Sequence, residues 1–388
     1  MERIKKFLNQ REGEDLLRVL HPADSRKQGK IIIDGKEYID FSSNDYLSLS
    51  DHPYLKETVI ETINSLGTGS CASRLLSGDL KLHHELEKKV AEFKGKESAL
   101  VFNSGYQANV GIISSIWQKG DVIFSDRLAH ASIIDGMLLS GAKLFRFNHN
   151  DTNHLEDLLE LERHKFKNAL IVTETIFSMD GDKTPLKELV ELKRKYNCNL
   201  MVDEAHATGI LGKYGSGLVE QEGLAFGIDL IMGTFSKALA SFGAYLACSK
   251  EIKDFLVNTC RSFIYSTALP PSVIAANIAS LELIEKEPNR RVSLLEQVGF
   301  FRHRLEELGF DVRGSSQIVP LVLGESKKAL LLSQELKKRG YWAKAIRPPT
   351  VPKNQARVRF SLTYSHSKGI LEKLISDIDE ISNTHPKI

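Results

Sequence analysis

Short, uninterrupted runs of hydrophobic residues recur between about residues 51 and 285 and alternate with segments of helical periodicity. The runs lack polar alternation, which is typical of strands buried on both faces of a largely parallel sheet. They cover residues 98–102, 121–124, 169–173, 199–202 and 229–233. Helical patterns such as the one over residues 185–192 lie between them. This order predicts an α/β fold: a three-layer, largely parallel mixed sheet with helices on both faces.

The two ends of the chain carry different patterns. The first fifty or so residues predict a short charged helix and then a strand pair, at 30–33 and 38–41. A helical pattern over 272–285 stops before Pro288. The remainder predicts a smaller α+β segment, with helices near 291–308 and 327–339, strands at 319–322 and 358–361, and a last helix. We therefore predict an N-terminal arm, a large α/β domain and a small C-terminal α+β domain, over residues 1–50, 51–287 and 288–388.

Composition narrows the class of protein. The 388 residues are 42% hydrophobic and 26% charged, which is ordinary for a globular protein of two or three domains. Lysine and arginine (52) nearly balance aspartate and glutamate (50), so no net field favours nucleic acid or an anionic membrane. No signal peptide or membrane span is evident, and we expect a cytoplasmic protein. The four cysteines form no C-x-x-C pair, so we expect neither a metal site nor disulfides.

Candidate chemistry gathers where predicted strands end. Asp203 follows the strand at 199–202, and Thr234 and Lys237 follow the strand at 229–233. Ligands of open α/β sheets bind beyond the carboxyl ends of strands, so these side chains are expected to converge. A lysine amine forms a Schiff base with the aldehyde of pyridoxal phosphate, and a carboxylate keeps the ring nitrogen protonated. A single aspartate at a strand end is more often a helix cap or a turn residue than a cofactor ligand, and a single lysine there is more often exposed to solvent. Their joint arrangement indicates a pyridoxal phosphate site.

Other positions fit this site but are weak individually. Ser178 follows a predicted strand after a short loop, and Gly105 lies where a strand gives way to a helix whose free N–H groups suit a phosphate. His130 suits stacking on a planar ring, although a capping or core histidine is the commoner role. Arg347 precedes two prolines, and that stiff backbone fits either a preorganised carboxylate clamp or a rigid surface turn.

Taken together, the motifs resemble the pyridoxal phosphate-dependent α-oxoamine synthases, which have the aminotransferase fold type I. The matching segments are 41–47, 104–109, 130–132, 177–182, 202–206, 234–237, 265–267 and 347–352. The string Arg347-Pro348-Pro349-Thr350-Val351-Pro352 points more narrowly to the 8-amino-7-oxononanoate synthase branch. The resemblance implies an acyltransferase of biotin biosynthesis. It would condense L-alanine with pimeloyl-CoA, or with a pimeloyl carrier protein, and release carbon dioxide.

The resemblance also implies roles for single residues. Lys237 would hold the cofactor and move a proton, Asp203 would pair with the pyridine nitrogen, and His130 would stack on the ring and assist catalysis. Further cofactor contacts would come from Gly105, Tyr106, Ser178, His206 and Thr234. Ser266 and Thr267 would reach the phosphate of a neighbouring subunit, which implies a homodimer with shared active sites. Substrate contacts would come from Arg18, Asn44, His130, Arg347 and Thr350, with Arg347 gripping the amino-acid carboxylate.

Two departures from the family pattern leave acyl-chain preference and loop closure open. Cys71 and Ala72 stand where close relatives often have two glycines, and Asn354 stands where a glycine is common. Two alternatives also remain open. One is another α-oxoamine synthase, such as a glycine C-acetyltransferase. The other is a non-catalytic binding or regulatory module with the same fold.

Overall fold

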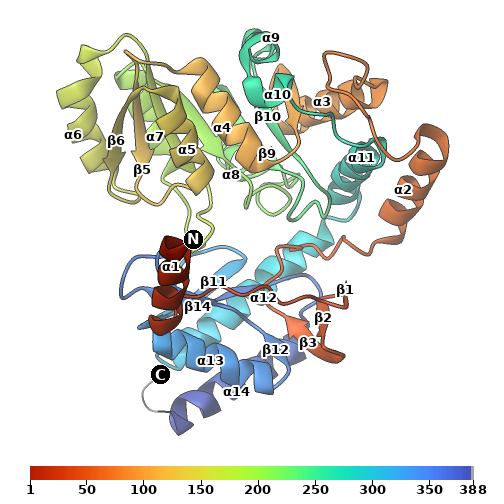
Figure 1. Cartoon of the computed structure of the whole chain (residues 1–388), viewed down its shortest axis with the longest axis vertical. Helices are drawn as coiled ribbons and strands as arrows, with labels where there is room; N and C mark the ends of the chain where they lie inside the picture. Colours follow the sequence, from red (N-terminus) through yellow and green to blue (C-terminus); the bar gives the residue numbers. More distant parts are fainter. Residues whose placement is uncertain (386–388) are drawn as a thin grey trace. The chain divides into compact units, whose positions relative to one another are not determined.

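The computed structural model describes residues 1–385 and divides into two compact units. Unit 1 comprises Met1–Ser48, Met179–Asp182 and the chain from Val292 onward. Unit 2 comprises Leu49–Ser178 and Lys183–Arg291. Each unit is described separately. Figure 1 gives the element labels.

Unit 2 is built on one seven-stranded sheet in the order β4-β10-β9-β8-β7-β5-β6. The strands are β4 (Ser98–Phe102), β5 (Val122–Asp126), β6 (Lys143–Phe147), β7 (Ala169–Glu174), β8 (Asn199–Asp203), β9 (Leu230–Thr234) and β10 (Ala244–Cys248). All neighbouring pairs are parallel except those of β10, which runs antiparallel to both β4 and β9. The mixed, largely parallel sheet is therefore confirmed, and β6 and β10 are strands that the hydrophobic pattern did not indicate.

Helices cover both faces of this sheet. They are α2 (Pro53–Leu66), α3 (Lys81–Lys94), α4 (Gly105–Ile116), α5 (Ala131–Ser140), α6 (Thr152–Glu162), α7 (Leu186–Lys195), α8 (Leu218–Gln221), α9 (Lys250–Thr259), α10 (Arg261–Ile264) and α11 (Pro271–Lys286). Apolar residues of α4, α5 and α9 pack with strand residues such as Leu170, Met201 and Leu246 in one core cluster. On the other face, α3 lies on β4 and β10, and α7 lies on β8.

Helices α4 and α5 approach each other closely because Gly136 has no side chain. A Cβ atom at position 136 would lie 2.9 Å from the carbonyl oxygen of Asn109 and 3.1 Å from the Cα atom of Val110. Both distances are too short for ordinary packing. The starts of the two helices are thereby held in a fixed relation. Within residues 1–385, no helix is both long enough and apolar enough to cross a membrane.

Unit 1 holds two small sheets. The first has the order β1-β2-β3-β12 and the second the order β11-β14-β13. Their strands are β1 (Ser25–Lys27), β2 (Lys30–Ile33), β3 (Lys36–Asp40), β11 (Ile318–Gly324), β12 (Tyr341–Trp342), β13 (Ala345–Ile346) and β14 (Ala356–Ser361). The helices are α1 (Glu2–Gly13), α12 (Asn289–Glu307, which begins in unit 2), α13 (Ser326–Lys338) and α14 (Lys368–Thr384). Because β12 pairs in parallel with β3, the N-terminal strands share a sheet with the C-terminal part of the chain.

The short excursion Met179–Asp182 is fastened inside unit 1 by an ion pair. The guanidinium of Arg357, which is buried in β14, donates to the carboxylate of Asp180 and, at 3.3 Å, to the carbonyl of Met179. The N–H of Ser315 also donates to the carbonyl of Gly181, at 2.9 Å. These bonds fix the backbone that follows Ser178.

A second buried ion pair supports the turn after β8. The ammonium of Lys94, at the end of α3, lies 2.7 Å from a carboxylate oxygen of Glu204 and also donates to the hydroxyl of Thr208 at 3.1 Å. The other carboxylate oxygen of Glu204 accepts the N–H of Val219 at 3.0 Å. Because both charges are almost fully shielded from water, the pair is stable only while both partners are present.

We predict that Lys94→Met lowers the free energy of unfolding by about 3–5 kcal/mol, because it strands the buried carboxylate of Glu204. Lys88→Met on the same helix is the matched control, since Lys88 and Glu92 form an exposed pair at 3.9 Å. We expect that control to cost less than about 1 kcal/mol. Urea unfolding of both variants measures the difference. Equal losses in the two variants would contradict this account of Lys94.

Candidate active site

The carboxyl ends of β7, β8 and β9 bring three of the predicted residues into one region of unit 2. Asp203 is the last residue of β8, and it pairs with Glu174 of β7 on one side and Met232 of β9 on the other. Thr234 is the last residue of β9. Lys237 lies in the turn that follows, whose shape is set by hydrogen bonds from Ala240 N–H to the Lys237 carbonyl and from Ser241 N–H to the Phe235 carbonyl, both 2.9 Å.

Asp203 is held by two hydrogen bonds, one to each carboxylate oxygen. Its Oδ1 accepts the N–H of Ala205 at 2.9 Å, and its Oδ2 accepts the side-chain amide of Asn109 at 2.9 Å. The side chain is 6% exposed. These bonds fix the orientation of the carboxylate and leave each oxygen able to accept another donor. A protonated ring nitrogen is such a donor.

The amide of Asn109 connects Asp203 to His130. Its Nδ2 also donates to the hydroxyl of Ser132 at 2.9 Å, and that hydroxyl lies 2.8 Å from Nδ1 of His130. The main-chain N–H of Ser132 points to the same nitrogen at 3.2 Å. A main-chain N–H is only a donor, so Nδ1 must be the acceptor and the proton of the neutral ring is assigned to Nε2.

His130 caps the start of α5, which is the role usual for such a histidine. The residue is exposed to solvent in the single chain. Burial of part of the imidazole lowers the pKa of His130; Asp203 opposes the shift and Lys237 adds to it. The imidazole is therefore biased toward its neutral form, with an N–H at Nε2. Its stacking on a ring stays a prediction.

The start of α4 supplies a small cradle. Ser104 caps the helix by accepting the N–H of Gln107 at 3.2 Å, and a Cβ atom on Gly105 would lie 2.8 Å from a methyl carbon of Thr234. The hydroxyl of Thr234 is buried and has no hydrogen-bond partner among residues 1–385. A helix start without side-chain obstruction and an unsatisfied buried hydroxyl both fit the phosphate of pyridoxal phosphate.

The other predicted cofactor residues lie around these groups or near them in sequence. Tyr106 is exposed, its hydroxyl bonds to Asp135, and its ring meets that of His130 edge-on with 6.3 Å between centroids. His206 is buried three positions after Asp203, and Ser178 is half-buried after β7. The hydroxyl of Ser266 lies 2.5 Å from the side-chain amide of Gln107, and the carbonyl of Thr267 accepts from Asn103 at 2.8 Å. Both of the last two residues therefore flank the start of α4 in their own chain.

Three buried polar residues were not among the predicted site residues. Asn109 and Ser132 carry the connection described above. Glu174 is 3% exposed, and one of its oxygens has no partner among residues 1–385. Burial raises the pKa of Glu174 well above its ordinary value, and the charge of Asp203 adds to the shift. Glu174 could have been found from the sequence, because it is a carboxylate at the end of the apolar run of β7. The hydrogen bonds of Asn109 could not, because they depend on the fold.

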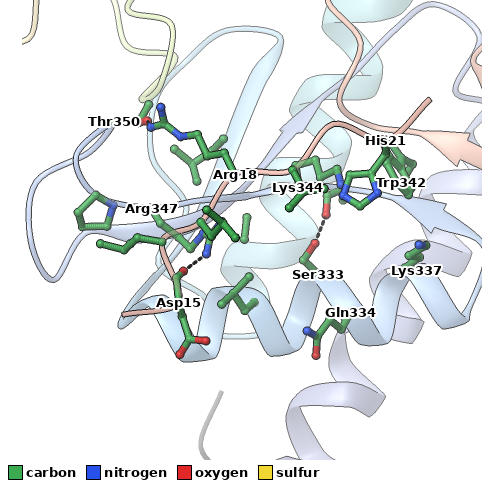
Figure 2. A pocket seen from close by; sticks show the side chains of 18 of the residues that line it. Asp15, Arg18, His21, Ser333, Gln334, Lys337, Trp342, Lys344, Arg347 and Thr350 are labelled. Carbon is green, nitrogen blue, oxygen red and sulfur yellow. Dashed lines mark hydrogen bonds between the residues drawn. The ribbon is translucent and has the colours of Figure 1, made fainter. Parts of the chain in front are cut away.

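The predicted substrate residues belong to unit 1, apart from His130. Figure 2 shows a cavity of about 770 Å³ in that unit, where Arg18, Arg347 and Thr350 lie together. Arg18 donates to the hydroxyl of Thr350 at 2.7 Å, and Arg347 donates to the carbonyl of Asp15. Asn44 does not line this cavity. Its amide oxygen accepts from the hydroxyl of Tyr46 at 3.1 Å and from Arg359 at 3.3 Å.

Comparisons with known proteins agree with this geometry. Residues 36–378 match the family model for aminotransferase class I and II. The chain is 47% identical to an 8-amino-7-oxononanoate synthase of Geobacter sulfurreducens over 377 residues, 96% of each chain. It is 46% identical to the 8-amino-7-oxononanoate synthase of Geotalea daltonii over 384 residues, 98% of each chain.

Solved structures give the same fold. Serine palmitoyltransferase of Sphingomonas wittichii superposes with a TM-score of 0.94 at 29% identity, covering 100% of this chain and 98% of that one. An 8-amino-7-oxononanoate synthase of Francisella tularensis gives a TM-score of 0.77 at 29% identity, covering 90% and 99%. A serine palmitoyltransferase from S. paucimobilis, with a TM-score of 0.93 at 28% identity and coverage of 99% and 98%, contains bound pyridoxal phosphate. The cofactor is therefore pyridoxal phosphate.

The hydrogen bonds to Nδ1 lead to a pH prediction. The hydroxyl of Ser132 can donate to Nδ1 only while that nitrogen is unprotonated, so Ser132→Ala removes support for neutral His130. The pKa of His130 should then rise toward its ordinary value of 6.5. We expect the imidazole titration, followed by nuclear magnetic resonance with labelled histidine, to move to higher pH. Ser140→Ala, at the far end of α5, is the control, because the Ser140 hydroxyl donates to the Met137 carbonyl instead. Identical titrations for wild type and Ser132→Ala would disprove the assignment.

Proposed function

Because the chain belongs to the 8-amino-7-oxononanoate synthases, pyridoxal phosphate-dependent acyltransferases of aminotransferase class I and II, we propose that it condenses L-alanine with a pimeloyl thioester. The products are 8-amino-7-oxononanoate, the free thiol and carbon dioxide, and the pathway is biotin biosynthesis. One observation carries the proposal: 47% identity extends over 96% of the chain, so the match covers both the strand-end region and the cavity of unit 1.

In this proposal the polar groups of unit 2 hold the cofactor. The amine of Lys237 would bind the aldehyde carbon, Asp203 would pair with the ring nitrogen, His206 would bond to the ring oxygen, and His130 would stack on the ring. Gly105, Tyr106, Ser178 and Thr234 complete the contacts, and the cradle at Gly105 and Thr234 takes the phosphate. When bound, the cofactor supplies a protonated ring that accepts the electron pair released at the Cα atom of the substrate.

In this proposal, side chains of the protein transfer protons and orient the substrate. Once the amine of alanine has replaced Lys237 at the aldehyde, the freed and unprotonated amine of Lys237 would remove the Cα proton of alanine. Nε2–H of His130 is the donor for the oxygen of the thioester carbonyl, because Nδ1 is occupied by Ser132. The guanidinium of Arg347 binds the carboxylate of alanine and sets the direction of its Cα–H bond. Arg18, Asn44 and Thr350 also contact substrate.

We further propose a homodimer whose active sites are shared. Large apolar side chains of unit 2 are exposed in the single chain, among them Leu76 (81%), Leu139 (68%) and Tyr265 (73%). Exposed apolar surface of this kind is typical of an interface. Tyr265 directly precedes Ser266 and Thr267, so a partner that covers it lies beside the residues proposed to reach a neighbouring phosphate.

Another α-oxoamine synthase activity is the alternative, and the high structural similarity to serine palmitoyltransferase bears on it. That similarity reports a shared fold at 29% identity, whereas the 8-amino-7-oxononanoate synthase of Geobacter sulfurreducens shares 47% of the aligned residues. Substrate preference depends on individual side chains more than on the fold. We therefore propose the acyl donor of the 8-amino-7-oxononanoate synthases, a pimeloyl thioester, because these relatives include the higher sequence identities.

We predict that Lys237→Ala abolishes product formation, by at least about a thousandfold, and that it prevents borohydride from trapping the cofactor on the protein. Lys250→Ala is the matched control, because Lys250 is an exposed lysine paired with Asp254. Mass spectrometry of the reduced protein locates the modified peptide. A trapped cofactor in Lys237→Ala would overturn the assignment of this lysine.

The substrate proposal is tested by a panel of alanine, glycine and serine against pimeloyl-CoA, acetyl-CoA and palmitoyl-CoA. We expect mass spectrometry to detect 8-amino-7-oxononanoate as the main product, and kcat/KM to be at least about tenfold higher for the alanine and pimeloyl-CoA pair than for any other. A preference for glycine with acetyl-CoA would instead support a glycine C-acetyltransferase.

A further inference from the structure

The cavity of unit 1 has a second cationic region, away from Arg18 and Arg347 (Figure 2). Its floor is the indole of Trp342, which is 7% exposed. The ammonium of Lys344 lies 3.9 Å from the centroid of the indole, and the ammonium of Lys337 lies 5.1 Å from it. His21 meets the same indole edge-on at 5.6 Å. Two ammonium groups and an imidazole thus lie around the same indole.

These cations are poorly neutralised. Within residues 1–385, no carboxylate lies within ion-pairing distance of Lys344 or Lys337. Burial lowers the pKa of Lys344, and the neighbouring charges of Lys337 and Arg347 add to the shift. Burial also lowers the pKa of His21; Lys344 and Lys337 add to the shift, and Asp34 opposes it. An anion placed among these groups would be attracted by all of them.

Carboxylates are present, but they lie elsewhere. Glu12 and Asp15 line the cavity, and the carbonyl of Asp15 accepts from Arg347. Asp34 and Glu37 line a separate hollow, which Lys337 also borders. Among residues 1–385, the charges that act on the ammonium of Lys344 are the cations Lys337 and Arg347. Its contact with Trp342 is a cation–π interaction, which holds the ammonium in place without neutralising it.

The rest of the lining is largely apolar. Leu16, Leu17, Val19, Leu330 and Ile346 contribute side chains to the same cavity. Its volume of about 770 Å³ is in the range of small-molecule sites. A hydrocarbon chain with a polar group at each end matches two cationic regions in one partly apolar cavity. A chain that is apolar throughout does not.

We infer that Lys344, Lys337 and Trp342 form an anion subsite for the acyl donor, and that the terminal carboxylate of a dicarboxylic acyl chain is the anion it takes. This inference rests on the proposed function, because that function supplies the acyl donor. A phosphate of coenzyme A, or of a carrier protein's phosphopantetheine, shares the anionic chemistry and is the second possible source. The experiment below separates the two.

The test compares pimeloyl-CoA with heptanoyl-CoA, which has the same chain length but no terminal carboxylate. In Lys344→Gln we expect kcat/KM for pimeloyl-CoA to fall about tenfold, as for the loss of one charge-assisted hydrogen bond, while kcat/KM for heptanoyl-CoA changes little. Lys338→Gln is the matched control, because Lys338 directly follows Lys337 at the end of α13 but pairs with Glu335 and does not line this cavity. A general folding defect would lower both donors and the melting temperature together.

A binding measurement tests the subsite without turnover. Trp342 is one of only two tryptophans, so quenching of its fluorescence reports a ligand at the subsite, and Trp342→Phe identifies its share of the signal. We expect heptanedioate to change the fluorescence of wild type at lower concentration than heptanoate does, and Lys344→Gln to remove that difference.

Each outcome has one meaning. A loss confined to pimeloyl-CoA supports the carboxylate, and an equal loss for both thioesters with an unchanged melting temperature supports a phosphate in the same subsite. Unchanged kinetics and unchanged heptanedioate binding in Lys344→Gln overturn the inference. If wild type makes no product from any donor yet binds heptanedioate through Lys344, then the proposed function fails while the subsite stands.

Discussion

The burial of a carboxylate at the end of β8 is the constraint on which the structure of unit 2 depends. Asp203 must stay oriented in a place that water barely reaches, and each of its oxygens accepts one hydrogen bond, from Ala205 or Asn109. Glu174 lies opposite it on the neighbouring strand, and two charged carboxylates so close together would repel each other. Burial raises the pKa of Glu174, and the charge of Asp203 adds to the shift, so Glu174 is biased toward the neutral acid. Next along the chain, Glu204 is anchored by Lys94.

The same amide that holds Asp203 also reaches the imidazole through Ser132, so two groups with different proposed tasks share one support. In this arrangement the ring nitrogen that faces away from Ser132 carries the hydrogen. An enzyme that must hold a pyridine ring between a carboxylate and an imidazole gains from such a shared support, because the two groups cannot shift independently. The chain belongs to a family of pyridoxal phosphate-dependent enzymes.

Much of the fold was predictable because buried parallel strands have a strong local signal. The runs at 98–102, 169–173 and 199–202 correspond to β4, β7 and β8 within a residue, and the helix predicted over 327–339 is α13, Ser326–Lys338. In unit 2, the hydrophobic pattern did not indicate β6 or β10. β6 lies at the edge of the sheet, and exposed residues lie among its partly buried and buried ones, so it forms no apolar run. β10 is apolar and runs antiparallel to both β4 and β9. The strand ends indicated Asp203, Thr234 and Lys237. No local pattern indicates Asn109 or the pairing of Arg18 with Thr350, which joins positions 332 residues apart. The roles of the single site residues stay predictions.

The absence of a side chain at Gly136 affects more than the packing around that residue. Gly136 lets α5 lie against the backbone of α4, and these two helices begin at His130–Ala131 and at Ser104–Gly105. An added methyl group would push the helices apart, and it would separate the cradle at Gly105 from the imidazole cap although it touches neither. A substitution in the middle of α5 would thus be felt at the starts of both helices, where Gly105 and His130 lie.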